Sequence, residues 1–355
     1  MKLATYQDGS RDGQLVVVSR DLTTAHYATG IASRLQQVLD DWNFMSPQLQ
    51  DLSDALNQTG HPRARHAFPF DAARCMAPLP RAYQWASGGA FARHAALLGQ
   101  AQDQMSGVHQ PMHPTQPPAY PCMQQGASDA FSGPHDPITV PSDATAAAWG
   151  IDFNAALAVI TGDVPRGATP AQALDGVRLL MLANEVSLRH LMANAQARGG
   201  SSMHGRQGTA FGPVAVTPDE LAGGGDIAWQ GGRVHLSVQS TWNSRKVGMV
   251  DAGPEMTFGF GELIAHVCRT RAVRAGSVIS SGTVSGGDAS RGYHCIAEKR
   301  ALEWLDNGKS STPYMALGDT IRIEVKGRDG LSVFGAIAQT VALVSALVAS
   351  SRRAA

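Results

Sequence analysis

The sequence lacks the features that mark nucleic-acid-binding, membrane-spanning and disulfide-bonded proteins. Its 29 basic and 29 acidic side chains cancel, so no net charge favours binding to nucleic acid or to an anionic membrane. The four cysteines form no CxxC pair, which argues against a zinc knuckle or a disulfide framework and fits a reducing compartment. The longest apolar run, at 336–349, is shorter than the roughly 20 residues that span a bilayer, and the N-terminus has no apolar signal segment. We therefore expect a soluble cytoplasmic protein.

Aromatic residues are also scarce, at 6 %, whereas 38 glycines and 19 prolines indicate many turns and short strands rather than a helical bundle. The 355 residues suffice for one large domain or two unequal ones. We predict a β-rich α+β fold with a small N-terminal domain at 1–74, a main domain at 75–341 and a C-terminal tail at 342–355.

The chain changes its local pattern along its length. Short β-like runs at the N-terminus precede a helical-looking segment at 31–58, which Pro47 should interrupt. The segment 169–198 should form a helix, a short strand and another helix. Strands then dominate to the end, at 233–243, 255–260 (EMTFGF), 277–284, 320–327 and 332–341, with a helix at 261–273.

The stretch 151–162, IDFNAALAVITG, alternates like a strand. Successive strand residues point to opposite sides, so Phe153 and Leu157 fall on a core face, while Asn154 and Ala156 fall on a small, weakly polar face. We expect that second face to border a cavity.

Two residues far apart in the sequence are candidates for acid–base chemistry. His94 lies near the start of a probable helix, where a structural role is commoner than catalysis. Glu298 lies on another helix, where a solvent-facing position is the default. If the two meet, the carboxylate would orient the imidazole and the pair would act as a general base.

Other segments could bind an anionic substrate. The Gly/Ser-rich turn SSGTVSGGDASRGYHC, with Thr283 near its start, could offer backbone N–H groups to an anionic oxygen, although a plain tight turn is as common. Arg189 and Arg206 could hold a carboxylate, although most arginines lie on the surface.

Several ordered blocks between Cys75 and Val341 resemble the fumarylacetoacetate hydrolase family. They are APLPRAYQWASGGAFARHA, SDAFSGPHDPI, WGIDFNAALAVITGDVP, LLMLANEVSLR, GTAFGPVAVTPDEL, GSVISSGTVSGGDASRGYHCIAEKR, TPYMALGDTIRIE and FGAIAQTV. The resemblance implies a mixed β-sandwich roll in the main domain, a homodimer, and hydrolysis of a C–C bond in a β-dicarbonyl acid. It also implies a Mg²⁺ or Ca²⁺ ion held by carboxylates.

The resemblance assigns roles to individual residues. The family's catalytic histidine and its glutamate partner correspond to His94 and Glu298. Four further positions correspond to substrate-binding groups: Arg189, Thr283, Arg206 in place of a lysine, and Gln124 in place of a tyrosine.

The metal-ligand positions of the family are mostly substituted in this chain. Three of the four carboxylates are replaced, by Ser87, Asn154 and Ala156, and only Glu185 keeps an acidic group. Because Mg²⁺ prefers several hard oxygen ligands, tight metal binding is not expected. Glu185, Arg189 and Arg206 sum to +1, so loss of the metal together with its ligands leaves no large uncompensated buried charge.

Our leading hypothesis is therefore a metal-independent enzyme that acts on a β-dicarbonyl, acylpyruvate-like or polyketide-type acid. His94 and Glu298 would generate an enolate-like species, which C–C hydrolysis, decarboxylation, isomerisation and condensation share. Two alternatives stay open. One is a Mg²⁺-dependent hydrolase with a degenerate metal site, and the other is a non-catalytic homologue that binds a small acid.

Overall fold

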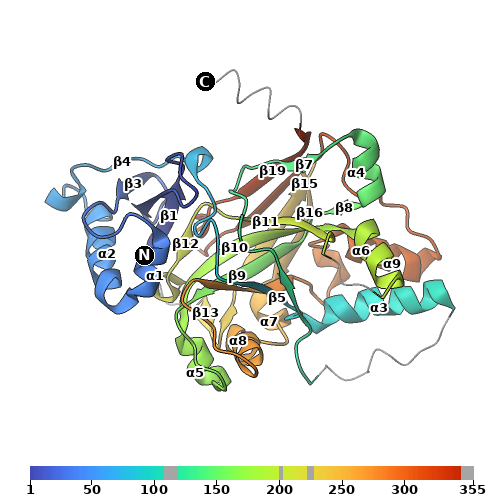
Figure 1. The fold of residues 1–355 in the computed structure, drawn as a ribbon. Coiled ribbons are helices and arrows are strands. Elements are labelled where there is room, and N and C mark those ends of the chain that lie inside the picture. Colours follow the sequence, from blue (N-terminus) through green and yellow to red (C-terminus); the bar gives the residue numbers. More distant parts are fainter. Residues whose placement is uncertain (108–118, 200–202, 222–227, 345–355) are drawn as a thin grey trace.

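The computed structural model describes residues 1–107, 119–199, 203–221 and 228–344 of the chain (Figure 1). Within them the structure is strand-rich and mixed, as the sequence predicts, with helices around two main sheets. No helix in this part of the chain is long and apolar enough to cross a membrane.

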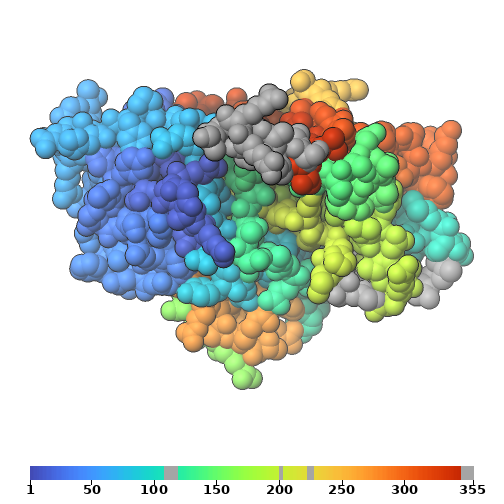
Figure 2. Space-filling view, turned by 45° about the horizontal axis from the view of Figure 1, so that its top comes forward, coloured from blue at the N-terminus to red at the C-terminus, as the bar shows by residue number. Residues whose placement is uncertain are grey.

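A twelve-stranded sheet links the N-terminal residues to the main domain. Its strands run in the order β4 (Phe68–Pro69), β3 (Thr24–Tyr27), β2 (Gln14–Val18), β1 (Lys2–Tyr6), β12 (Ala215–Val216), β10 (Val177–Leu188), β9 (Ala155–Thr161), β17 (Ser277–Thr283), β5 (Trp85–Gly88) and β6 (Met123–Gly126). Two further strands, β11 (Arg206–Phe211) and β8 (Ile151–Asp152), pair with β10. The N-terminal strands therefore continue the sheet that carries the candidate site, although Figure 2 shows residues 1–74 as a lobe at one side.

A second sheet and nine helices complete this part of the chain. The five-stranded sheet runs β16 (Arg245–Asp251), β15 (Ser237–Trp242), β18 (Thr320–Val325), β19 (Ile337–Leu343) and β7 (Ile138–Val140), and β13 (Trp229–Gln230) pairs with β14 (Arg233–Val234). The helices of the described residues are α1 (Leu35–Asp40), α2 (Trp42–Leu56), α3 (Ala92–Ser106), α4 (Asp143–Trp149), α5 (Pro170–Asp175), α6 (Arg189–Ala197), α7 (Ala252–Glu255), α8 (Phe260–Cys268) and α9 (Ile296–Asn307).

The central strands bring the four expected metal-ligand positions close together. In β9, Ala156 lies opposite Ala183 of β10 on one side and Thr283 of β17 on the other. Strand β5 runs parallel to β17, which places Ser87 beside Ser280. Glu185 lies on β10, just beyond its pairing with β9.

The small face of 151–162 does not border a cavity, so that expectation is wrong. Ala156 and Ala158 are fully buried in an apolar cluster that also contains Leu35 of α1 and Leu49 of α2. The opposite face belongs to the other main apolar cluster. Small side chains occur on β9 because apolar groups cover both of its faces. The strand is also interrupted, since β8 ends at Asp152 and β9 begins two residues later.

Two other local predictions are wrong. Pro47 lies inside α2, and the helical segment instead breaks at Asp41, whose φ of −134° and ψ of 54° are not helical. The segment 255–260 is not a strand, although its alternating apolar side chains are buried. The backbone N–H groups of Thr257 and Phe258 both donate to Ala90 O, so the segment forms a turn that leads into α8.

The other strand and helix predictions in the second half agree more closely with the structure. Strands were expected and are found at β15, β17, β18 and β19, and the helix after residue 260 is α8. The segment between the helices α5 and α6, expected to be a short strand, is the twelve-residue β10. Most of the C-terminal tail, residues 345–355, lies outside the described residues.

Candidate active site

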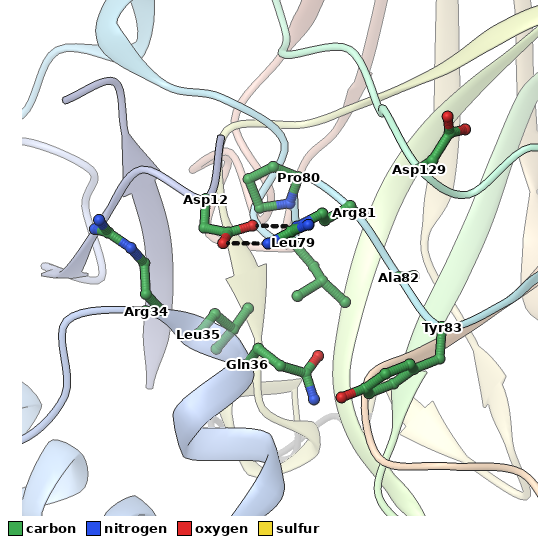
Figure 3. A pocket seen from close by; sticks show the side chains of 10 residues that line it. All are labelled: Asp12, Arg34, Leu35, Gln36, Leu79, Pro80, Arg81, Ala82, Tyr83 and Asp129. Carbon is green, nitrogen blue, oxygen red and sulfur yellow. Dashed lines mark hydrogen bonds and ion pairs between the residues drawn. The ribbon is translucent and has the colours of Figure 1, made fainter. Parts of the chain in front are cut away.

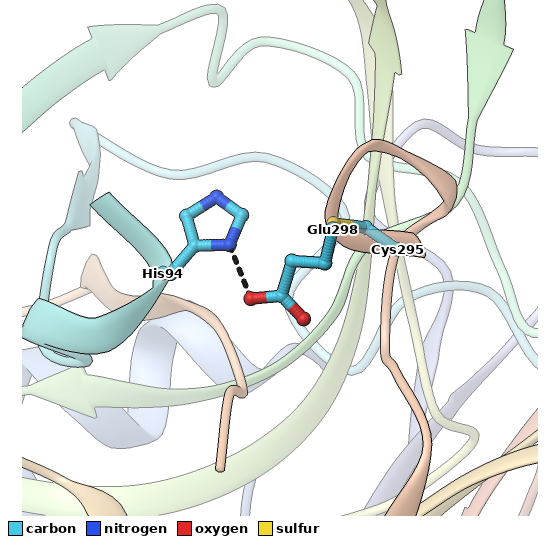
Figure 4. Close-up of side chains that lie close together, drawn as sticks. All are labelled: His94, Cys295 and Glu298. Atoms are coloured by element: carbon cyan, nitrogen blue, oxygen red, sulfur yellow. Dashed lines mark hydrogen bonds and ion pairs between the residues drawn. The ribbon is translucent and has the colours of Figure 1, made fainter. Parts of the chain in front are cut away.

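The first part of the site is a histidine–glutamate pair between two helices. His94 lies in the first turn of α3 and Glu298 in the first turn of α9, and these helices pack side by side (Figure 1). His94 Nδ1 and Glu298 Oε1 are 2.7 Å apart (Figure 4). Glu298 is only 4 % exposed, so it does not have the solvent-facing position that its helix alone suggested.

The environment of Glu298 favours its ionised form. Burial, the largest single influence, would raise the pKa of this carboxyl, but hydrogen bonds from His94 and Ser285 and the charge of His94 lower it overall. A carboxylate only accepts hydrogen bonds, so His94 Nδ1–H donates and Nε2 keeps a free lone pair. The side chain of His94 is 21 % exposed. This arrangement is that of an oriented general base with access to solvent.

A buried aspartate, Asp152, ties α9 to the central strands. Its Oδ1 accepts a hydrogen bond from Ile296 N–H at 2.6 Å, and its Oδ2 accepts one from Ala297 N–H at 3.1 Å. Its Oδ2 also accepts from Arg189 Nε at 2.8 Å. The carboxylate thus satisfies the free N–H groups at the start of the helix that carries Glu298. The sequence patterns predict no role for Asp152, and the available signal is a charged residue inside an otherwise apolar strand.

Asn154 holds three segments of the site together. Its Oδ1 accepts from Arg189 Nη2 at 2.6 Å and from Thr283 Oγ1 at 3.0 Å. Its Nδ2 donates to the backbone oxygen of Glu185 at 2.8 Å. The amide therefore links β17, the start of α6 and β10 through its own hydrogen bonds.

Glu185 is paired with an arginine and a serine. Its Oε2 accepts from Arg206 Nη1 at 2.7 Å and from Ser87 Oγ at 2.8 Å, and its Oε1 is buried with no hydrogen-bond partner among the described residues. The Arg206 guanidinium lies 5.1 Å from the ring centroid of Trp85, and its Nη2 is 3.4 Å from Gln124 Oε1. Glu185, the one acidic residue left at the metal-ligand positions, is therefore paired with the permanent cation of Arg206.

The residues at the expected metal position do not fit Mg²⁺ or Ca²⁺. These ions need several oxygen ligands, and Ala156 supplies none. The side-chain oxygen of Asn154 already accepts from two donors, and one oxygen of Glu185 is bound to a guanidinium. Ser87 Oγ donates to Glu185 Oε2, and the buried Oε1 of Glu185 lies beside a fixed positive charge that would repel a cation.

The charge balance of the site differs from the sequence estimate. That estimate of +1 counted Glu185, Arg189 and Arg206 but omitted Asp152. The structure pairs Arg189 with Asp152 and Arg206 with Glu185, which makes the four groups neutral together. Burial alone would lower the pKa of Arg189, but the Asp152 carboxylate and its hydrogen bond raise it overall. Arg189 is therefore a charged partner for Asp152.

Two backbone N–H groups of the Gly/Ser-rich turn have partners within the protein. The N–H of Val284 donates to Ala155 O, and that of Gly287 donates to a carboxylate oxygen of Glu255. Thr283 uses its hydroxyl to support Asn154. In this structure these groups position the wall of the site.

A separate cavity lies away from the histidine–glutamate pair, between the N-terminal lobe and the main domain. Its volume is about 400 Å³, and its lining includes Leu35 and Tyr83. Figure 3 shows Arg81 reaching across to Asp12, with two hydrogen bonds of 2.7 Å. None of the candidate catalytic residues lines this cavity. The Arg81–Asp12 pair at this cavity is a polar contact between the N-terminal lobe and the main domain.

Comparison with protein families gives two matches that together span most of the chain. Residues 1–81 match the model of fumarylacetoacetase N-terminal domain 2, and residues 84–342 match that of the fumarylacetoacetate (FAA) hydrolase C-terminal domain.

One curated relative is 2,4-didehydro-3-deoxy-L-rhamnonate hydrolase from Sphingomonas sp. (strain SKA58). It is 28 % identical over 172 residues, which cover 48 % of this chain. The match spans 54 % of that relative's length.

Solved structures share the fold over almost the whole chain. Maleylpyruvate hydrolase from Sphingobium sp. SYK-6, in complex with manganese(II) ion and pyruvate, has a TM-score of 0.59 and 15 % identity, covering 97 % of this chain and 99 % of that one. The 2-hydroxyhepta-2,4-diene-1,7-dioate isomerase from Mycobacterium marinum has a TM-score of 0.56 and 17 % identity, with the same coverage of 97 % and 99 %. At these identities the likeness establishes the fold.

Proposed function

The chain belongs to the fumarylacetoacetate hydrolase family, and from this premise we propose that it is an enzyme that acts on a β-dicarbonyl or acylpyruvate-like acid without a divalent metal ion. By their printed names, two of the relatives named above are hydrolases and one is an isomerase, which supports an enzyme of this general class. The observation that carries the proposal is the guanidinium of Arg206, bound to the remaining carboxylate of the metal-ligand set.

His94 acts as the general base in this proposal. Its Nε2 takes a proton from water, or from an acidic carbon of the substrate, while Glu298 stabilises the imidazolium that forms. In the hydrolytic case, the water oxygen forms a bond to the substrate carbonyl carbon. The neighbouring C–C bond then breaks, and its electron pair passes into an enolate of the departing fragment. The imidazolium gives its proton to the enolate carbon that was part of the broken bond.

Arg206 supplies the positive charge that stabilises the enolate. Its side chain is 23 % exposed, so part of the guanidinium can contact a ligand while Nη1 stays on Glu185. Arg189 was expected to bind substrate, but two of its nitrogens donate to Asp152 and Asn154. We therefore assign Arg189 a positioning role and Arg206 the electrostatic one.

The decisive experiment is turnover of acylpyruvates and related diketo acids by the purified protein, followed by loss of enol absorbance. We expect activity to persist after treatment with EDTA and to gain nothing from added Mg²⁺, because the wall of the site offers no free set of oxygen ligands. Activity that disappears on chelation and returns with Mg²⁺ would establish the metal-dependent alternative. Thermal stabilisation by these acids without any product would favour a binding protein.

A further inference from the structure

A third side chain lies against the histidine–glutamate pair and has no part in the mechanism above. Cys295 directly precedes α9, is fully buried and is not in a disulfide. One ligand atom from each of His94, Glu298 and Cys295 lies within 4.8 Å of the other two (Figure 4). A nitrogen, an oxygen and a sulfur donor thus converge at one point of the site.

This donor set differs in kind from the oxygen set that Mg²⁺ and Ca²⁺ require. Thiolate and imidazole ligands select Zn²⁺ and other thiophilic ions. Ligands of a tetrahedral ion with bonds of 2.0–2.3 Å lie roughly 3.5 Å apart. His94 Nδ1 and Glu298 Oε1 are 2.7 Å apart, and none of the three ligand atoms lies more than 4.8 Å from another, so small shifts bring them to that spacing.

We propose that His94, Glu298 and Cys295 form a binding site for a thiophilic divalent cation such as Zn²⁺ or Cd²⁺, and that the ion inhibits the enzyme. The partial exposure of His94 gives the ion a route from solvent, and three protein ligands leave a fourth position for water. Inhibition follows because the ion uses the base and the carboxylate that orients it. Only this inhibitory effect rests on the proposed function.

Binding requires two local changes. At the histidine, the hydrogen bond of 2.7 Å between His94 Nδ1 and Glu298 Oε1 must open, and the ring proton must move from Nδ1 to Nε2 so that Nδ1 can bind the ion. Burial, and then the carboxylates of Asp152 and Glu298, raise the pKa of the Cys295 thiol well above its ordinary value, so the thiol is protonated at neutral pH. Each ion that binds therefore displaces the thiol proton into solvent as the metal–sulfur bond forms.

The test is a titration of the purified, EDTA-treated and dialysed protein with Cd²⁺ and with Co²⁺. We expect one equivalent to produce a thiolate-to-metal charge-transfer band, and Co²⁺ to add the visible bands of a tetrahedral site. Cys295→Ser removes the thiol and places serine, a favoured N-cap residue, at the N-cap position of α9, and both signals should be lost. In Cys122→Ser, which removes an exposed cysteine, both should persist. Thermal melting verifies that each variant is folded.

The charge-transfer band decides the metal-site proposal without reference to turnover. A band that survives in Cys295→Ser, or no band at all in the native protein, overturns the site. If the band appears as expected in a protein that turns over none of the diketo acids, the metal site stands and the proposed function fails. If both hold, Zn²⁺ should inhibit the native enzyme, EDTA should reverse the inhibition, and Cys295→Ser should be several-fold less sensitive.

Discussion

Two buried glutamates of this protein each lie 2.7 Å from a basic nitrogen, yet the two pairs suit different tasks. Glu298 meets a histidine, which exchanges a proton near neutral pH. Glu185 meets an arginine, whose guanidinium stays charged throughout. The same distance thus gives a proton-transfer pair on one side of the site and a fixed charge on the other.

The two carboxylates also differ in how they are held in place. Glu298 is fixed through its helix, because Asp152 binds the first N–H groups of α9. Glu185 is fixed through side chains, since Ser87 and Arg206 both bind one of its oxygens. The first pair depends on the position of a helix, and the second depends on direct contacts. Substitutions can therefore affect the two pairs separately.

The largest expected effect comes from removing the proton carrier while keeping the hydrogen bond to Glu298. In His94→Gln the amide can still donate to the carboxylate, but no base remains. We expect kcat to fall by about 10²- to 10⁴-fold, with the melting temperature close to that of the native protein. Steady-state kinetics with the best diketo acid measure this. His66→Gln, at an exposed histidine, is the control and should retain full activity.

Removing the fixed charge should lower the stability of the folded protein as well as its activity. Arg206→Gln leaves Glu185 buried with only Ser87 as a partner, so the free energy of unfolding should fall by about 3–5 kcal/mol in urea titrations. The double variant Arg206→Gln/Glu185→Gln removes the stranded charge and should recover most of that loss. Equal losses in the single and double variants would contradict a coupled pair.

Arg206→Lys tests whether the shape of the cation matters as well as its charge. Lysine keeps the charge but loses the planar guanidinium that lies over Trp85. We expect a loss of about 1 kcal/mol in transition-state stabilisation, seen as a several-fold lower kcat/KM. A variant as active as the native protein would show that charge alone is sufficient.

The smallest effect should appear only in acid. The pKa of Glu298 is lowered in the folded protein, so its ionised form contributes stability above the ordinary glutamate value of 4.5. That contribution is lost as the pH falls below 4.5 through the lowered folded-state pKa. The difference in melting temperature between the native protein and Glu298→Gln should therefore shrink as the pH falls below 4.5. A difference that grew in acid would contradict this sign.

Much of the site could be placed from the sequence only through its resemblance to a family. His94 and Glu298 are 204 residues apart, and no local pattern indicates that α3 and α9 pack together. Alternation did predict β9, but it could not reveal what covers each face. The N-terminal helices bury the face of Ala156, which involves residues more than 100 positions away.

Local rules failed where a distant group supplied the missing partner. Pro47 is tolerated inside α2, whose Leu49 and Leu52 are buried in an apolar cluster that also contains residues of β2. Asp152 escaped notice because its partners, the first N–H groups of α9, come from a segment far along the chain. Buried polar residues of this kind require knowledge of tertiary contacts.

The shared sheet restricts how this protein can be rebuilt from parts. Two family models divide the chain near residue 82, which invites the exchange of the first segment between relatives. However, β1 pairs with β12 through Lys2 opposite Val216 and Leu3 opposite Ala215. A chimera must reproduce that register, or β12 will present an unpaired edge to other chains. A chimera should therefore be designed to keep the pairing of β1 with β12, and the position of the cut in the sequence does not by itself ensure this.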